Sequence, residues 1–346
     1  MSEELLEVKH LSTSFFTHVG EVKAIRDISF AVDRGEFVGI VGESGSGKSV
    51  TSLSILRLLQ YPGKVTGGEI LLNGEDLLKK DKREMRKIRG NQISMCFQDP
   101  MTALNPLYTI GNQINEVILE HQKLTKAEAT KKTIEMLGMV GIPDPEARVK
   151  CYPYEFSGGM RQRAMIAMAL ACQPELLIAD EPTTALDVTI QAQVLRLLKD
   201  LQERTGTSVI LITHDLGVVA QMCDEVIVMY AGSICEQGTA DEIFYNPCHE
   251  YTKGLLRSIP SASNVGEKLE PIHGTPIDLL NMPAGCPFAP RCEAAMKICL
   301  RERAERMRIN EDHLASCWMN VKKGLEDGSI ELAEDKDAER KDGADA

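Results

Sequence analysis

Short apolar runs alternate with helix-like segments along most of this chain. Residues 37–41, 176–179 and 208–213 predict strands, and the first two runs are apolar enough to be buried. Residues 50–59 predict a helix after the first of these strands, and residues 5–32 alternate apolar and polar positions, which is typical of short strands. Strands that alternate with helices favour an α/β fold with a doubly wound core.

A different pattern interrupts this core at residues 99–156. There, residues 110–122 and 126–140 suit two amphipathic helices, so we expect an inserted helical subdomain. After Tyr230 the composition turns toward Pro, Gly and Ser, with a linker near residues 260–283 and a small separate module beyond it. At 346 residues the chain is long enough for two domains.

A candidate phosphate-binding loop lies between the first strand and its helix. Gly42 to Ser49 spell G-x-x-x-x-G-K-[ST], and glycine permits the positive φ angles and close backbone approach that such a loop needs. We expect Lys48 to reach the β- and γ-phosphates of ATP and Ser49 to ligate Mg²⁺. A flexible surface loop is the alternative, which the complete strand, loop and helix context disfavours. The residues expected to contact the nucleotide are Gly42, Ser44, Gly45, Ser46, Gly47, Lys48, Ser49 and Val50.

Two carboxylates follow the second strand. Asp180 and Glu181 come directly after residues 176–179, at the strand end where open α/β sheets bind ligands. We expect Asp180 to contact the water shell of Mg²⁺ and Glu181 to orient or deprotonate the attacking water. A solvent-facing acidic strand end explains either carboxylate alone, but it explains the pair at this place poorly.

A second glycine motif, Ser157-Gly158-Gly159, precedes a helical run at residues 162–172. A helix N-terminus offers free N–H groups and a partial positive charge, so this motif also suits a phosphate. Together, the loop, the carboxylate pair and this motif resemble the nucleotide-binding subunit of ABC transporters over roughly residues 5–255. The resemblance implies a P-loop NTPase cassette with a mostly parallel core sheet, an N-terminal antiparallel β subdomain and an inserted helical subdomain at about residues 99–160.

The same resemblance assigns further residues. Gln98 looks like the Q-loop glutamine, which senses the γ-phosphate and Mg²⁺ and contacts the membrane subunit, and Asp187 looks like the D-loop aspartate. His214 looks like the switch histidine, and Phe15 is the best match to the aromatic residue that stacks on adenine, with Phe16 as the fallback. Each residue alone has a simpler explanation: a surface glutamine, a helix-capping aspartate, a strand-end histidine and a core aromatic. Their order and spacing favour the family roles.

The resemblance also implies a partner cassette. In the family, the Ser157-Gly158-Gly159 motif closes on the γ-phosphate held by a second subunit, so that two cassettes enclose two ATP molecules. Phe156 replaces the usual leucine and Met160 the usual glutamine of this motif. The serine and glycine donors remain, and the variant is similar to one found in a branch of the peptide importers.

The net charge of −12 is concentrated at one end. Residues 326–346 hold nine acids and three bases, so half of the excess lies in a tail that we expect to be disordered. No basic surplus indicates a nucleic-acid partner. The sequence contains neither a signal peptide nor an apolar run of transmembrane length, so we expect peripheral attachment to the cytoplasmic face of a membrane through partner subunits.

Ten cysteines occur, and a reducing compartment makes structural disulfides an improbable use for them. Cys96, Cys172 and Cys223 lie in apolar or helical surroundings that are typical of a core. Four others crowd into 32 residues with little apolar sequence, which favours a metal centre as the basis of that module's fold. They are Cys286, Cys292, Cys299 and Cys317, with gaps of five, six and seventeen residues. Structural zinc usually takes its ligands in pairs two to four residues apart, so the spacing favours iron–sulfur, with zinc open as the alternative.

Two runs, residues 285–292 and 246–256, resemble the C-terminal extension of oligopeptide and dipeptide importer ATPases. This resemblance implies a [4Fe-4S] cluster on the four cysteines, and its role is expected to be structural because nothing in an ATPase cycle needs an electron. Zinc remains the main alternative, in which His313 could replace a cysteine, and unligated thiols or disulfides are the remaining one. The expected domains are a nucleotide-binding domain at 1–258, the cysteine extension at 259–325 and the acidic tail at 326–346. Because the extension is expected to be separate, loss of a cysteine should spare nucleotide binding.

These resemblances identify the chain as a D-type ATPase subunit of an oligopeptide or dipeptide ABC importer, which makes it a translocase. The implied partners are a second, related ATPase in a heterodimer, two integral membrane permease subunits and an extracytoplasmic solute-binding protein. The rival from another class is an ABC ATPase of translation or DNA repair, but the second cassette and the long coiled coil typical of those proteins are absent. A regulatory iron–sulfur or zinc protein that merely binds ATP is disfavoured by Glu181 and His214. An ATPase subunit does not touch the solute, so peptides, nickel, glutathione and some sugars remain open.

Overall fold

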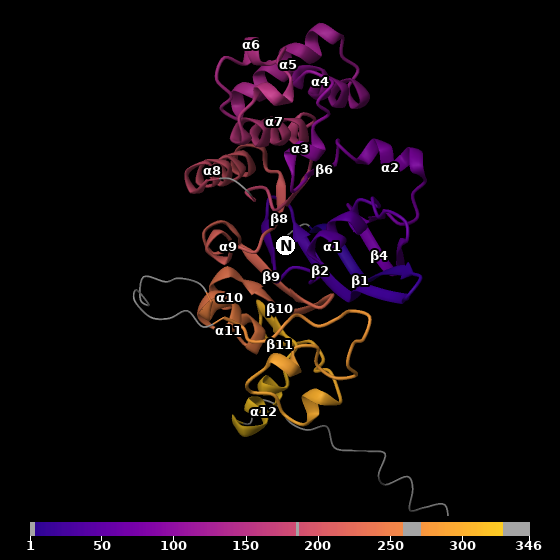
Figure 1. The fold of residues 1–346 in the computed structure, drawn as a ribbon, viewed down its shortest axis with the longest axis vertical. Coiled ribbons are helices and arrows are strands. Elements are labelled where there is room, and N and C mark those ends of the chain that lie inside the picture. Colours follow the sequence, from indigo (N-terminus) through magenta and orange to yellow (C-terminus); the bar gives the residue numbers. More distant parts are fainter. Residues whose placement is uncertain (1–3, 185–186, 259–270, 328–346) are drawn as a thin grey trace, which may run out of the picture.

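A computed structural model describes residues 4–184, 187–258 and 271–327. Figure 1 shows a helical lobe at the top, an α/β core in the middle and the C-terminal extension at the bottom. The helical lobe is inserted between strands β6 and β7 of the core. This arrangement agrees with the expected cassette.

An eight-stranded sheet forms the centre, in the order β11-β12-β10-β9-β3-β8-β7-β6. The neighbouring strands from β9 to β6 run parallel. Every residue of β3, β7 and β8 is buried, which explains why these segments are nearly unbroken apolar runs. The parallel strands are β3 (Phe37–Val41), β6 (Ile93–Cys96), β7 (Leu176–Asp180), β8 (Ser208–Ile212) and β9 (Glu225–Tyr230), and β10 (Ser233–Thr239) pairs with β9 antiparallel.

Helices cover this sheet, and one of them differs from its prediction. Helix α1 spans Lys48–Ile55, so it begins and ends earlier than the predicted residues 50–59. Leu56 is its C-cap, and a turn follows with Arg57 at φ 51°. The other helices near the core are α2 (Lys82–Ile88), α8 (Val188–Thr205), α9 (Leu216–Met222), α10 (Ala240–Tyr245) and α11 (Glu250–Arg257).

The N-terminal sheet is antiparallel, as expected, but its strands are long rather than short. Strands β1 (Glu4–Thr17) and β2 (Gly20–Asp33) have 14 residues each, and β4 (Gly63–Leu72) and β5 (Glu75–Asp76) complete the order β2-β1-β4-β5. The pairing of β1 with β2 shifts register four times. Each shift interrupts the apolar alternation, which is why the sequence suggests several short strands.

The helical lobe matches its prediction closely. Helices α4 (Ile110–His121) and α5 (Lys126–Met139) each end within one residue of the expected position. Thr109 caps α4, and Thr125 forms a capping box with Glu128 at the start of α5, so the side chains fix both starts locally. The lobe also contains α3 (Pro100–Ala103), α6 (Pro145–Arg148), the 3₁₀ turn η1 (Pro153–Glu155) and α7 (Gly158–Leu170).

The C-terminal extension is not a separate module, and the structure corrects that expectation. Its strands β11 (Met307–Asn310) and β12 (His313–Ala315) continue the core sheet beside β10. In the expected linker, residues 259–270 lie outside the described residues, whereas residues 271–283 place Ile272, Ile277, Leu279 and Met282 against the core. The extension also contains η3 (Ala289–Arg291), η4 (Ile298–Leu300) and α12 (Trp318–Asp327). Most of the acidic tail lies outside the described residues.

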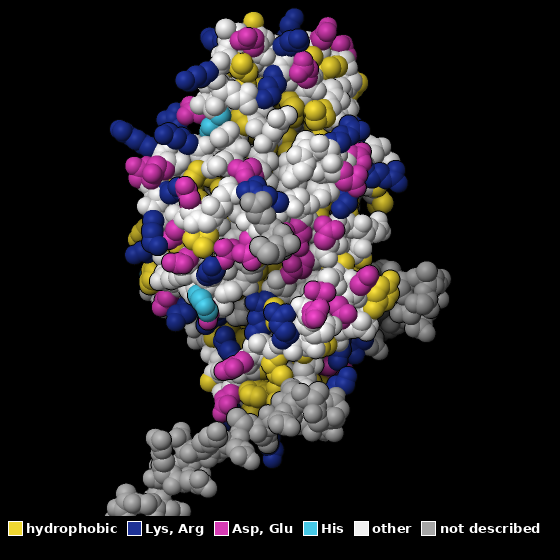
Figure 2. All heavy atoms as spheres, turned by 180° about the vertical axis from the view of Figure 1, so that it is seen from behind, with side chains coloured by type: hydrophobic (Ala, Val, Ile, Leu, Met, Phe, Trp, Pro, Cys, Tyr) yellow, Lys and Arg dark blue, Asp and Glu magenta, His cyan; other side chains and the backbone are white. Residues whose placement is uncertain are grey.

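Charges of both signs are interspersed over the face seen in Figure 2, where Lys and Arg side chains alternate with Asp and Glu. Among the described residues, no helix is both long and apolar enough to cross a membrane. The visible face therefore offers no extended basic surface of the kind that nucleic acids bind.

Candidate functional site

The candidate phosphate-binding loop connects β3 to α1 through a backbone that requires glycine at two positions. Gly42 has φ 147°, and a Cβ there would lie 2.2 Å from the carbonyl oxygen of Met229. Gly47 has φ 108°, and its Cβ would lie 2.9 Å from the carbonyl oxygen of Ala24. Any larger residue at either position would displace neighbouring backbone, so the glycines fix the loop against β9 and β2.

Lys48 extends back over this loop. Its Nζ donates to the carbonyl oxygens of Gly42 at 2.7 Å and Glu43 at 3.0 Å, and the residue is only 6% exposed. Burial lowers its pKa, while the negative charges of Glu181, Asp180 and Glu43 act in the opposite direction. The ammonium group is therefore held on the inner side of the loop, close to the two carboxylates at the end of β7, those of Asp180 and Glu181.

Ser49 and Asp180 meet as the sequence predicts. The hydroxyl group of Ser49 donates to Oδ1 of Asp180 at 3.1 Å. The pKa of Asp180 is raised, mainly by burial and also by the nearby charge of Glu181. The hydrogen bond from Ser49 acts in the opposite direction. A hydroxyl and a carboxylate oxygen are the hard ligands that Mg²⁺ prefers, so this pair fits the expected ion.

Glu181 accepts hydrogen bonds from several residues of the site. Gln98 donates to its Oε2 at 2.7 Å, and His214 Nδ1 lies 3.3 Å from its Oε1. Thr184 also donates to Oε2, at 2.9 Å, which sequence reasoning missed because no motif singles out this residue. The backbone of Glu181 has φ 46°, and its N–H donates to the carbonyl oxygen of Ile212. A strained non-glycine residue tied to the neighbouring strand is typical of a functional position.

The surroundings keep the Glu181 carboxyl ionised. Burial raises its pKa, but hydrogen bonds from Thr184 and His214 and the charges of His214 and Lys48 outweigh that effect, so the net pKa lies below the usual value. An ionised carboxylate next to the phosphate loop can accept a proton from water.

Ser157 caps helix α7, with its side chain accepting from Met160 N at 3.3 Å, so the motif lies at a helix N-terminus as predicted. The helix itself spans Gly158–Leu170, and it therefore begins and ends earlier than the predicted residues 162–172. Ser157 and Gly158 are exposed, and a Cβ at Gly158 would meet nothing within 4 Å. Gly159 instead packs so closely on α8 that a Cβ would lie 2.8 Å from Ile190 Cγ2. In Figure 1, α7 belongs to the upper lobe, apart from α1 in the core. The motif thus faces outward.

Two expected nucleotide residues have local roles in the structure. Asp187 caps α8 by accepting from Ile190 N at 3.0 Å, and its D-loop neighbours, residues 185–186, lie outside the described residues. Phe15 is half-buried over Gly63, whereas Phe16 is 49% exposed. The roles of Asp187 and Phe15 in nucleotide binding remain predictions.

The four cysteines of the extension lie in one neighbourhood. Burial raises the pKa of Cys286, and the nearby thiol of Cys299 raises it further. Burial also raises the pKa values of Cys292 and Cys317, and the thiol of Cys286 adds to both. The backbone N–H of Cys286 donates to the carbonyl oxygen of Cys299 at 2.7 Å, over Gly285, where a Cβ would lie 2.2 Å from that oxygen. All ten cysteines are free, and Cys96, Cys172 and Cys223 are buried as predicted.

The thiol spacing is more open than a zinc site. In the described part of the chain, no three of these four sulfurs lie within 4.8 Å of one another. Four thiolates around one zinc ion would lie about 3.8 Å apart, given zinc–sulfur bonds of about 2.3 Å in a tetrahedron. The donor set consists of four soft thiols in a loop-rich segment.

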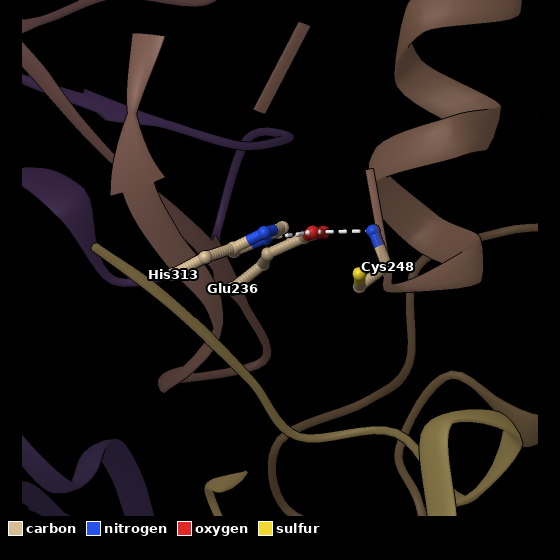
Figure 3. A group of neighbouring side chains, drawn as sticks. All are labelled: Glu236, Cys248 and His313. Atoms are coloured by element: carbon tan, nitrogen blue, oxygen red, sulfur yellow. Dashed lines mark hydrogen bonds and ion pairs between the residues drawn. The ribbon is translucent and has the colours of Figure 1, made fainter. Parts of the chain in front are cut away.

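His313 is engaged elsewhere, which argues against its use as a zinc ligand beside the cysteines. Its Nε2 lies 2.8 Å from Glu236 and its Nδ1 3.2 Å from Glu242, and the histidine side chain is fully buried. Figure 3 shows the ring of His313 directed at the carboxylate of Glu236. The backbone N–H of Cys248 donates to this carboxylate from the opposite side. Burial lowers the pKa of His313, but the two carboxylates outweigh it and the net pKa is raised. The pair holds β12 against β10.

Comparisons with known proteins agree with this geometry. The family described as "ABC transporter" matches residues 25–184, and the family described as "Oligopeptide/dipeptide transporter, C-terminal region" matches residues 235–299. The chain is 56% identical to the dipeptide transport ATP-binding protein DppD of Bacillus subtilis, over 92% of this chain and 95% of that protein. It is 51% identical to the oligopeptide transport ATP-binding protein OppD of Escherichia coli, over 86% and 88%. A solved dimer of the ATP-binding cassette MJ0796 bound to ADP and Pi matches with a TM-score of 0.62 at 29% identity, over 68% of this chain and 98% of that one.

Proposed function

The chain belongs to the ABC transporter family, in the branch of ATP-binding subunits of oligopeptide and dipeptide importers, and we propose that it hydrolyses ATP to drive the uptake of short peptides. The observation that carries this proposal is the convergence on Glu181 of Gln98 and His214, beside the paired Ser49 and Asp180. Such a set combines a base, a magnesium site and a residue that contacts membrane subunits in this family. A mere nucleotide-binding protein would need only the loop.

We infer a distinct role for each of these residues. The loop amides and Lys48 bind the triphosphate, whose negative charge matches the ammonium group and the N-terminus of α1. Ser49 and Asp180 would hold Mg²⁺, which neutralises charge on the phosphates. Glu181 accepts the proton of the attacking water, while Gln98, Thr184 and His214 hold its carboxylate in place.

A non-transport ABC ATPase of translation or DNA repair is the rival function. It is disfavoured by the match of residues 235–299 to the C-terminal region of oligopeptide/dipeptide transporters. The mixed charges of the face in Figure 2 also give no support to a nucleic-acid partner.

Reconstitution with two membrane permease subunits tests the proposed function. We expect this chain to co-purify with them at the cytoplasmic face of the membrane, and a peptide-loaded extracytoplasmic binding protein to stimulate ATP hydrolysis. Hydrolysis that responds to nickel or a sugar, and not to peptides, would overturn the peptide assignment alone. Failure to associate with any permease would overturn the transport function.

We also propose that the second ATPase is a related but different chain. Ser157 and Gly158 are exposed at the start of α7 and are free to face another subunit's nucleotide. The isolated chain is therefore expected to bind ATP but hydrolyse it slowly, and the rate should rise when the partner cassette is added. Steady-state ATPase rates of the two chains, alone and mixed, measure this. An isolated chain that is as fast as the complete transporter would contradict the heterodimer.

We further propose that Cys286, Cys292, Cys299 and Cys317 bind a [4Fe-4S] cluster. Two observations support it: the four thiols lie near enough to raise one another's pKa, and no three of their sulfurs in the described residues lie as close together as the ligands of one zinc ion. The cluster's role would be to cross-link the loops of the extension, because no step of ATP hydrolysis requires an electron.

Anaerobically purified protein is expected to be brown, with about four irons per chain and a broad absorbance at about 400 nm. Cys292→Ser should lose the colour and loosen the extension, which limited proteolysis would detect. Cys151→Ser, at a partly exposed cysteine outside the extension, is the matched control and should stay brown. Colourless protein with stoichiometric zinc would decide for the zinc alternative.

A further inference from the structure

The C-terminal extension holds the phosphate-binding loop directly. Arg291, at the end of η3, meets the side chain of Glu43, the second residue of the loop, with Nη2 to Oε1 at 2.9 Å and Nη1 to Oε2 at 2.5 Å. The arginine side chain is 5% exposed and that of Glu43 is 25% exposed. Two parallel bonds between a planar guanidinium and a carboxylate fix orientation as well as distance.

Arg291 is itself immobilised by the extension and by β9. Its Nε donates to the carbonyl oxygen of His273 at 3.0 Å, and its guanidinium carbon lies 5.9 Å from the ring centres of both Tyr230 and Phe288. The next residue in the chain is Cys292, one of the four clustered thiols. The position of Glu43 therefore depends on how the cysteine-bearing loops are folded.

A second tether acts on the backbone of the same loop residue. The N–H of Glu43 donates to the hydroxyl oxygen of Tyr251 at 2.8 Å, while its carbonyl oxygen accepts from Lys48. Tyr251 is fully buried and packs against Tyr230 and Phe288, with ring centres 4.7 and 5.3 Å away. One aromatic cluster thus supports both tethers.

The extension also lines the loop further along. A cavity of ≈ 110 Å³ is bounded on one side by Ser44 and Ser46 and on the other by Pro276, Ile277 and Leu279. These contacts involve a segment for which the sequence predicts only a linker.

Charge gives the Arg291 contact a further consequence. Glu43 places a carboxylate on a loop that is proposed to bind the negative triphosphate. The charge of Glu43 raises the pKa of Lys48, so the two side chains interact electrostatically. Arg291 neutralises that carboxylate at hydrogen-bond distance. Without the guanidinium, Glu43 would both lose its fixed position and repel the phosphates.

We propose that Arg291 is a positioning residue of the ATP site: through Glu43, and together with Tyr251, it holds the phosphate-binding loop in its binding conformation, so that the folded state of the cysteine-rich extension sets the affinity for ATP. The proposal rests on the proposed function, because it assumes that this loop binds ATP. It makes the extension a regulator of the nucleotide site.

The test compares variants of the full chain, assembled with its partner cassette, for ATP dissociation constant, KM and kcat. Arg291→Met is expected to weaken ATP binding and raise KM by about 5- to 150-fold, the usual range for coupled sites. The kcat at saturating ATP should stay close to wild type, since the contacts of Glu181 are untouched. Arg301→Met, at an exposed arginine of the same extension, is the matched control and should bind ATP normally.

A double variant separates positioning from general damage. Arg291→Met/Glu43→Gln removes the unpaired charge and is expected to recover part of the affinity lost in Arg291→Met. If Arg291→Met fails to fold or melts early, two milder variants replace it in the test. Arg291→Lys keeps the positive charge but loses the bidentate contact, and Tyr251→Phe keeps the ring but loses the hydroxyl acceptor. Wild-type ATP affinity in Arg291→Met with an intact extension, or in both milder variants, would overturn the proposal. A wild-type chain that binds no ATP would instead overturn the proposed function.

Discussion

Replacing Glu181 with glutamine is expected to leave ATP binding intact and to slow hydrolysis by about 10²- to 10⁴-fold, the usual cost of losing a general base. Glutamine has the same shape and can still bond to Gln98 and Thr184, but it cannot accept a proton from water. The net pKa of Glu181 lies below its usual value, so the wild-type base stays ionised at neutral pH and loses its charge only in acid. Nucleotide affinity and single-turnover hydrolysis, measured separately in the complete transporter, check the two halves of this prediction.

Glu175→Gln is the matched control for that substitution. Glu175 precedes the same strand β7 at its opposite end and pairs with Arg34 at 3.0 Å, away from the loop. Its replacement should leave hydrolysis within a few-fold of wild type. Normal turnover in the Glu181 variant would mean that another group activates water, and the assignment of the base would fall.

Most of the arrangement of the candidate site could be predicted because its parts are local in sequence. The phosphate loop is a continuous run, and Asp180 and Glu181 follow a strand whose apolar residues are consecutive. Thr109 and Thr125 cap α4 and α5, and each bonds to a residue only three positions further along the chain. Such local contacts determine where a helix starts, and the bounds of both helices agree with the prediction to within one residue. Parallel strands then bring their carboxyl ends to one edge, which is why Ser49 and Asp180 meet as expected.

The parts that could not be predicted depend on contacts between distant segments. Strand β12 has three residues, and nothing in so short a run shows that it pairs with β10. The bulges that join short apolar stretches into the long β1 and β2 have no sequence signature of their own. Thr184 carries no motif, so its bond to Glu181 emerges only from the fold.

The contact between Arg291 and Glu43 is the clearest case. The two residues are 248 positions apart, and an arginine beside a cysteine motif gives no hint of a partner in the phosphate loop. For that reason the sequence suggests that the extension and the nucleotide site are independent. The bidentate contact argues for coupling, so changes in the cysteine-rich extension are expected to reach ATP affinity as well.

Lys48→Ala is expected to weaken ATP binding by about 2–4 kcal/mol, which corresponds to roughly 30- to 1,000-fold in the dissociation constant. The substitution removes the cation that is expected to face the phosphates, and it also removes the donor to the carbonyl oxygens of Gly42 and Glu43. Lys87→Ala, at an exposed lysine of α2, is the matched control and should bind normally. Burial lowers the pKa of Lys48, so the ammonium group loses its charge at a lower pH than an ordinary lysine does. As the pH is raised, the ATP affinity of the wild type should therefore fall earlier than an ordinary lysine would titrate. The affinity of Lys48→Ala should not show this fall. Equilibrium titration with a fluorescent ATP analogue over a pH series measures both effects, and equal affinities for wild type and variant would show that the phosphates bind elsewhere.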